Sequence, residues 1–254
     1  MQPLLLLMAF LLATMIEAEF FFQGKVIGGH EAKPHSCSYM VLIQITTPKR
    51  RRCGGFLVRE DFVLTAAHCF RRSISVTLET HNFKKHEKTQ QIILVKTAIA
   101  HPGYCPRFND IMLLQLQKKA RPTAIVSLLR LPRRGEEVKP DMVCSMASSG
   151  RLDMNTTTNK LHEVDLEVQR DELCISYYKR FYSKATQICV GDPKKNQSSF
   201  SGDSGGPFVC DNVAQGIVPL GKNNGNPPRV YTRISSFLPR IERTRRRLQL
   251  QRPD

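Results

Sequence analysis

The sequence FSGDSGGP at residues 200–207 constrains this chain more than any other stretch. A serine hydroxyl becomes a nucleophile only where its surroundings supply a base and an anion site, and Ser204 is the candidate nucleophile. Gly202 lacks a Cβ, so its backbone can place the N–H groups of Gly202 and Ser204 in one small oxyanion hole. Asp203 puts a carboxylate beside the nucleophile, and the Gly-Gly-Pro that follows allows a tight turn into the next strand. Alone, the tetrad GDSG is also compatible with an ordinary glycine-rich turn.

Two further segments, LTAAHC at residues 64–69 and NDIMLL at residues 109–114, weaken that simpler interpretation. Together with residues 200–207 they resemble the chymotrypsin-like serine proteases, and they stand in that family's chain order of His, Asp and Ser. The resemblance runs from Val26 to about Arg247. It implies a catalytic triad of His68, Asp110 and Ser204, with the backbone amides of Gly202 and Ser204 as the oxyanion hole.

The resemblance also implies the fold class: all-β, with two six-stranded antiparallel Greek-key barrels and a short C-terminal helix. Apolar and β-branched residues recur with a period near two, which is typical of strands. A proline-rich, charged stretch over 121–140 predicts a linker, so we expect an N-terminal barrel over 26–130 and a C-terminal barrel with the helix over 131–254. The expected strands are 39–45, 56–64, 75–78, 91–97, 111–116, 161–168, 187–190, 207–210, 214–218 and 230–233, and the helix starts at Ser235.

The N-terminus carries an apolar run over 4–15 that is too short to span a bilayer but fits the core of a signal peptide. We expect a signal peptide over 1–18 and an activation propeptide over 19–25. In the family the freed N-terminal amine, here that of Val26, pairs with the acid before the nucleophile, here Asp203. A secreted protein, stored in secretory granules before release, follows from this. A buried N-terminal helix or a membrane anchor is the alternative, although no second apolar run predicts a membrane span.

Eight cysteines in an exported chain predict a disulfide framework, whose pairing the spacing alone leaves open. The family resemblance implies three bridges and two free thiols. No spacing typical of a metal site and no phosphate-binding loop occurs, so we expect neither a metal nor a cofactor. The implied bridges are Cys53–Cys69, Cys144–Cys210 and Cys174–Cys189, and the free thiols are Cys37 and Cys105.

The formal net charge of +16, from 38 Lys and Arg against 22 Asp and Glu, indicates acidic partners. The basic runs are scattered and have little aromatic interleaving, which favours heparin-like sulfated proteoglycan over sequence-specific nucleic acid. A merely solvated basic surface is the alternative. We also expect protein substrates, serpin inhibitors, a monomer, and a glycan on Asn155 in its NTT acceptor pattern.

Within the family, HEAKPH at 30–35, GGFLVRED at 54–61 and NNG at 223–225 resemble the granzyme, cathepsin G and mast-cell chymase branch, including duodenase. The residue of granzyme B that matches Arg229 is an arginine. An arginine fork pairs bidentately with a carboxylate, so Arg229 predicts cleavage after acidic P1 residues. The competing interpretation is that Arg229 turns to solvent or pairs locally and leaves an apolar, chymase-like pocket. The substrate-binding residues implied by the branch are Ser198, Ser199, Pro219, Gly221 and Arg229.

Several positions depart from the family pattern. The segment at 219–221 replaces a Ser-aromatic-Gly, the segment at 148–150 replaces Gly-Trp-Gly, and Arg240 stands where relatives have tryptophan. The chain contains no tryptophan, and each lost indole costs about 3–5 kcal/mol if nothing refills the space. The sequence therefore predicts a serine endopeptidase, with a basic glycan-binding granule protein of the same fold and weak or lost proteolysis as the alternative.

Overall fold

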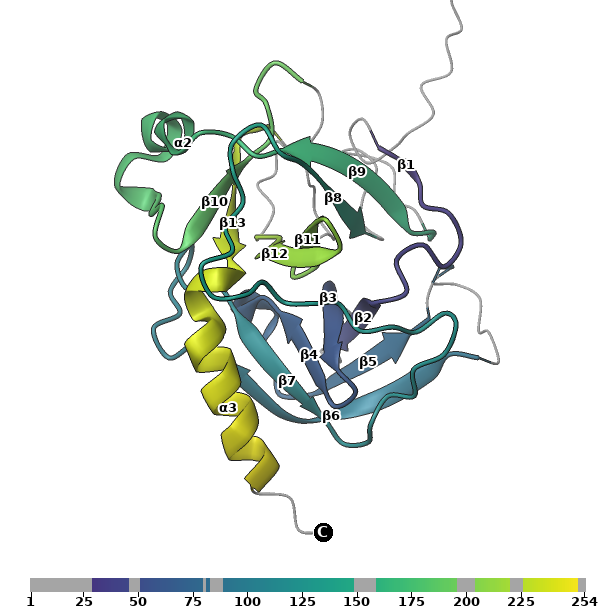
Figure 1. Cartoon of the computed structure of the whole chain (residues 1–254). Helices are drawn as coiled ribbons and strands as arrows, with labels where there is room; N and C mark the ends of the chain where they lie inside the picture. Colours follow the sequence, from purple (N-terminus) through teal and green to yellow (C-terminus); the bar gives the residue numbers. More distant parts are fainter. Residues whose placement is uncertain are drawn as a thin grey trace, which may run out of the picture.

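The computed structural model describes residues 29–45, 51–79, 81–82, 89–148, 159–195, 204–219 and 226–250. These residues form two β-sheets stacked one above the other, with a long helix along one side (Figure 1). Several expectations from the sequence lie outside the described residues. They are the signal peptide over 1–18, the propeptide over 19–25, Val26, Asn155, Ser198, Ser199, Gly202, Asp203 and Gly221.

The first sheet is a closed barrel in the order β2-β3-β4-β7-β6-β5, with antiparallel neighbours throughout. Its interior is built from fully buried apolar side chains, including those of Phe56, Leu64 and Leu114. In the closed order each of these strands pairs on both sides, so this sheet is a rigid support for whatever it carries. Its strands are β2 (Met40–Ile45), β3 (Arg51–Arg59), β4 (Phe62–Thr65), β5 (Ile74–Leu78), β6 (Gln91–Ala100) and β7 (Met112–Leu116).

The single strand expected over 56–64 is wrong, because the chain makes a hairpin there between β3 and β4. The turn residue Asp61 is buried, and its carboxylate accepts bonds from Arg59 Nε at 2.5 Å and Nη2 at 2.6 Å. This pair satisfies the charge inside the turn, so apolar residues can continue on both sides of it. In the sequence, the apolar patterns of these two strands therefore look like one continuous strand.

The second sheet has seven strands among the described residues, in the order β1-β9-β8-β11-β12-β13-β10. An isolated bridge between Val168 and Val190 brings the two ends of the six-strand run from β9 to β10 together, and β1 adds outside β9. In the described residues this sheet is thus a half-barrel whose two ends are joined only by that single bridge, with β1 as one extra strand beyond the expected six. Its strands are β1 (His30–Glu31), β8 (Val143–Ser148), β9 (His162–Glu167), β10 (Gln187–Val190), β11 (Pro207–Cys210), β12 (Val213–Ile217) and β13 (Arg229–Arg233).

The C-terminal helix α3 (Leu238–Leu250) follows the short turn η3 (Ile234–Phe237), close to the expected start. It leaves the second sheet after β13 and runs beside the first barrel, where Ile241 and Leu248 join the barrel's core (Figure 1). A second helix, α2 (Asp171–Tyr178), with the turn η2 (Lys179–Phe181), is not predicted by the sequence pattern. None of the helices in the described ranges has the length and apolar character needed to cross a membrane.

Three disulfide bonds cross-link the described chain. They join β3 to the turn η1 (Ala67–Cys69), β8 to its neighbour β11, and α2 to β10. Each closes a loop that would otherwise be free in the unfolded chain, which stabilises the fold by about 3 kcal/mol or more per bridge. The pairs are Cys53–Cys69, Cys144–Cys210 and Cys174–Cys189, whereas Cys37 is a buried free thiol and Cys105 an exposed one.

Candidate active site

His68 lies in η1, directly after β4, and Asp110 holds it at two points. The Asp110 carboxylate accepts a bond from the backbone N–H of His68 at 2.9 Å, and its other oxygen lies 2.7 Å from His68 Nδ1. Both side chains are about nine-tenths buried, so little water competes for these bonds. Nε2 of His68 is buried and has no hydrogen-bond partner in the described part of the chain. The imidazole is therefore oriented with Nε2 as its unengaged nitrogen.

Asp110 is itself fixed from both sheets. It precedes β7, and its backbone carbonyl accepts a bond from Thr232 Oγ1 of β13 at 3.2 Å. Asn109 before it has a positive φ of 53°, a conformation that asparagine tolerates better than most residues. Asp110 thus lies at a junction between the barrel and the second sheet, and no sequence motif indicates Thr232 as its neighbour.

Ser204 lies just before β11 and is buried with 7% exposure. Its backbone carbonyl accepts a bond from Gly54 N–H of β3 at 2.8 Å, which ties the serine to the first barrel. The hydroxyl donates to the carbonyl of Pro219 at 3.3 Å, a long bond. The structure therefore joins His68 to Asp110, while the hydroxyl of Ser204 is directed to Pro219.

Gly205 shows why the segment after the serine needs glycine. Its φ is +85°, and a Cβ built there would lie 2.3 Å from Thr65 Oγ1 and 2.6 Å from the carbonyl oxygen of Gly54. No side chain fits in that space, so only glycine lets the serine loop pack so closely on β3 and β4. The sequence pattern predicts a tight turn here but not the strands against which the turn packs.

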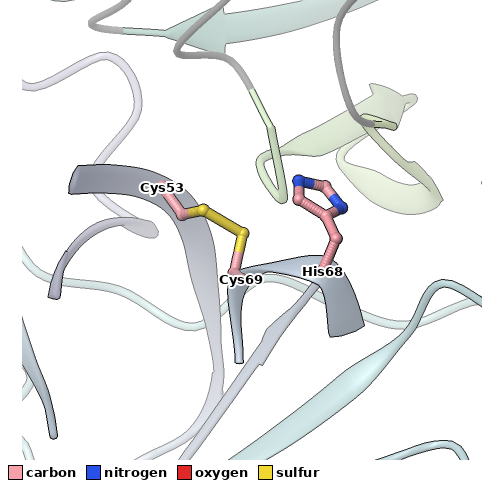
Figure 2. Close-up of side chains that lie close together, drawn as sticks. All are labelled: Cys53, His68 and Cys69. Carbon is pink, nitrogen blue, oxygen red and sulfur yellow. A yellow bond between two sulfur atoms is a disulfide. The ribbon is translucent and has the colours of Figure 1, made fainter. Parts of the chain in front are cut away.

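The disulfide Cys53–Cys69 lies beside the imidazole of His68 (Figure 2). In the described ranges, only these three residues bring three potential metal-ligand atoms within 4.8 Å of one another. The two sulfurs are bonded to each other at 2.04 Å, so neither is a thiolate that could bind a metal ion. The bridge instead fixes the segment that carries His68 to the wall of the barrel.

His68 and Ser204 line the same open cleft, which has a volume of about 480 Å³. Tyr104, from the expected loop at 101–109, also lines this cleft. Burial first, and then the negative charge of Asp110, raises the pKa of the Tyr104 phenol. Tyr104 therefore stays protonated at neutral pH and presents a neutral, amphipathic wall next to the imidazole.

Arg229 begins β13, pairs with Val190 of β10, and is only 2% exposed. Its Nη1 has no hydrogen-bond partner in the described residues. Of the two forms of the competing interpretation, the structure thus contradicts the one in which this side chain turns to solvent. A buried guanidinium nitrogen without a partner is costly, so the arrangement favours a ligand that brings an acceptor.

Arg240 of α3 fills part of the region where relatives have tryptophan. It borders a cavity of about 20 Å³ together with His101 and Phe237, whose rings meet edge to face at 5.4 Å. That volume is roughly one water molecule's worth of space, so neighbouring side chains refill most of the region. At this position the described residues do not enclose the large void that the missing indole predicts.

The comparison with known protein families agrees with this geometry. A family model described as Trypsin matches residues 26–241, which include His68, Asp110 and Ser204. The chain therefore belongs to the trypsin family of serine endopeptidases.

Within that family the chain is similar to the granzyme and cathepsin G branch. It is 53% identical to "Cathepsin G" of Mus musculus over 258 residues, covering 100% of this chain and 97% of that protein. It is 55% identical to "Granzyme H" of Homo sapiens over 251 residues, covering 98% and 100%. The solved "Structure of GrC" matches with a TM-score of 0.83 and 48% identity, over 87% of this chain and 100% of that one. The resemblance to this branch and the chymotrypsin-like fold are thereby confirmed.

Proposed function

We propose that this chain is an active serine endopeptidase in which His68, Asp110 and Ser204 form the catalytic triad. The observation that carries the proposal is the pair of hydrogen bonds from His68 to the buried Asp110 carboxylate, which leaves Nε2 free to accept a proton. A base held in this way activates a nearby hydroxyl, because its second nitrogen is fixed in orientation.

In the proposed reaction, Ser204 Oγ leaves the Pro219 carbonyl by rotation about its Cα–Cβ bond and turns to His68 Nε2. The hydroxyl attacks the substrate carbonyl carbon while its proton moves to Nε2, and Asp110 stabilises the resulting imidazolium. The amides of Gly202 and Ser204 would hold the oxyanion. His68 then protonates the leaving amine, the acyl-enzyme forms, and water reverses the steps to release the acid.

The binding protein with weak or lost proteolysis is a second candidate, favoured by the bond from Ser204 Oγ to Pro219 in place of His68. A fluorophosphonate probe distinguishes the two, since it labels only a serine that its base activates. Labelling that disappears in Ser204→Ala supports the endopeptidase. Absence of labelling in a folded chain that starts at Val26 supports the binding protein.

Specificity for acidic P1 residues is the next part of the proposal. Its support is the buried Nη1 of Arg229, which has no hydrogen-bond partner among the described residues. Arg229 begins strand β13 and stands at the position that the branch uses for its substrate pocket. An aspartate or glutamate side chain would supply the missing acceptor, and Ser198 and Ser199 would leave the base of the pocket open. A P1-diverse peptide library tests this. Preference for Phe or Leu that Arg229→Gly does not alter would contradict it.

Activation is proposed to follow cleavage of the bond between Lys25 and Val26, because only a free Val26 amine can pair with Asp203. We also propose storage in granules and secretion, binding of heparin-like proteoglycan through the net charge of +16, serpin inhibition, and a glycan on Asn155. Heparin retention that falls steeply with salt supports the glycan partner, since exposed charges are screened. Equal retention on a neutral resin contradicts it.

A further inference from the structure

The cleft that contains His68 and Ser204 also carries charge for which the proposed mechanism has no use. Apart from His68, the titratable side chains on its wall are those of Arg52, Arg71 and Tyr104, and no Asp or Glu among the described residues lines it. Neither arginine forms an ion pair with a described carboxylate. The described wall of the cleft therefore presents two unneutralised cations to whatever peptide lies in it.

Arg71 is held in place by the backbone of the histidine segment. Its Nη1 donates to the carbonyl oxygen of Phe70 at 2.5 Å and to that of His68 at 3.3 Å. These bonds use one nitrogen and restrict the long side chain, so less conformational entropy is lost when the remaining donors bind an anion. A guanidinium fixed in this way is a better recognition group than a freely solvated one.

Both arginines lie close in the chain to the Cys53–Cys69 disulfide. That disulfide lies beside the imidazole of His68 (Figure 2). Arg52 precedes Cys53 on β3, and Arg71 follows Cys69 by two residues. In the proposed reaction His68 passes a proton to the leaving amine, so the peptide segment after the scissile bond lies along the histidine side of the cleft. In the proposed specificity, the P1 side chain on the acyl side instead pairs with Arg229, which belongs to β13 of the second sheet.

We propose that Arg52 and Arg71 select an acidic side chain among the first few residues that follow the scissile bond. The inference rests on the proposed endopeptidase function and is separate from the P1 preference assigned to Arg229. Guanidinium forks pair well with carboxylates, but this cleft is open to solvent, so each pair makes a modest contribution. The substrate class is thus a protein segment with an acid on the leaving-group side of the cut.

The test uses activated enzyme and internally quenched peptides with one fixed P1 residue. Glu, Gln or Lys is placed in turn at each of the first three positions after the cut, and kcat/KM is measured. We expect Glu to exceed Gln by about fivefold at one of these positions, and Lys to fall below Gln. The preference should shrink as salt rises from about 0.05 M to about 0.5 M, because partly exposed charges are screened.

Substitutions test whether Arg52 and Arg71 cause the preference for Glu over Gln. The double change Arg52→Gln and Arg71→Gln should bring the Glu to Gln ratio close to one, and each single change should lower it in part. Arg134→Gln is the matched control, because Arg134 is an exposed arginine in the segment between the two sheets and does not line this cleft. Its ratio should equal that of the unaltered enzyme. If the double variant kept the Glu to Gln ratio of the unaltered enzyme, the proposed role of Arg52 and Arg71 would be wrong.

A chromogenic anilide with the same P1 residue separates the two levels of inference, because it has no amino acid after the cut. Absence of anilide hydrolysis in the activated, folded chain means that the endopeptidase proposal itself fails. Anilide hydrolysis together with equal kcat/KM for Glu, Gln and Lys at all three positions means that only the leaving-side proposal fails.

Discussion

The first barrel and the second sheet make different contributions to the candidate site. The barrel supplies His68 and Asp110, which are buried, bonded to each other and braced by the Cys53–Cys69 bridge. The second sheet supplies Arg229, whose buried Nη1 has no hydrogen-bond partner among the described residues. The hydroxyl of Ser204, just before β11, makes a single long hydrogen bond to the carbonyl of Pro219 among the described residues. The proposed base is therefore organised before substrate arrives, while the proposed nucleophile and the proposed pocket keep polar atoms that a substrate can engage.

The largest expected effect comes from a substitution in the His68–Asp110 pair of the first barrel. Asp110→Asn keeps the size of the side chain but removes the charge that orients His68 and stabilises its imidazolium. We expect kcat to fall about 10⁴-fold, the magnitude known for the equivalent change in this family. The measurement is kcat on a peptide anilide, with circular dichroism to show that the variant is folded. A loss below tenfold would mean that the Asp110 contact is only structural.

The second prediction concerns the place where the two halves meet. Gly205→Ala would push a Cβ to within 2.3 Å of Thr65 Oγ1 at a φ of +85°. We expect a loss of about 2–5 kcal/mol in the free energy of unfolding, from left-handed backbone strain and close contact together.

Gly135→Ala is the matched control for Gly205→Ala, since Gly135 has a φ of +81° and no described atom lies within 4 Å of the position that an added Cβ would take. It should cost about 1 kcal/mol, from backbone strain alone. Urea unfolding measures both variants. Equal losses would show that the packing of the serine turn on β3 and β4 contributes nothing beyond strain.

The third prediction separates stability from activity by comparing two bridges of similar loop length. Cys53–Cys69 spans 16 residues and Cys174–Cys189 spans 15, so removing either pair as alanine should cost about 3 kcal/mol. Loss of the first bridge releases the segment of His68 and should lower kcat. Loss of the second frees α2 from β10, the strand paired with β13, and should change P1 selectivity more than kcat.

Thermal unfolding and peptide kinetics on the two bridge variants test this separation. The outcome that counts against it is an equal loss of kcat in both variants at matched temperature below their unfolding transitions. That result would mean that the bridges act on activity only through overall stability.

The smallest expected effect is a pH dependence at the helix that links the two halves. Burial, and then the charge of Arg240, lowers the pKa of His101 below its ordinary value of 6.5. Below pH 6.5 the unfolded chain therefore binds a proton that the folded chain takes up only at lower pH, so stability falls as pH drops through this window. Arg240→Gln removes one cause and should reduce that loss.

NMR titration of the His101 ring measures its pKa directly, and thermal unfolding at about pH 7 and pH 5 measures the effect on stability. His162, whose pKa burial also lowers, serves as an internal reference because Arg240 is not among the causes of its shift. An unchanged His101 titration in the variant would show that burial alone sets its pKa.

The sequence by itself determined the family and the candidate catalytic groups. The segments around His68, Asp110 and Ser204 contain groups whose proposed roles depend on residue type and chain order. The short-range apolar pattern was enough to predict most strands, and it predicted β10 and β11 at their observed bounds. It could not separate β3 from β4, because the buried Arg59–Asp61 pair lets an apolar pattern run through a turn. It also missed α2, which the structure ties to β10 through the Cys174–Cys189 bridge.

Only the tertiary structure decided which groups meet. The contact of Thr232 with Asp110 and the contact of Gly54 with Ser204 each join segments that are far apart in the chain. Such contacts depend on how the barrel and the second sheet close against each other, and no local period records that. Burial of Arg229 is decided in the same way, because residue type fixes its charge while the surrounding strands fix whether water reaches it.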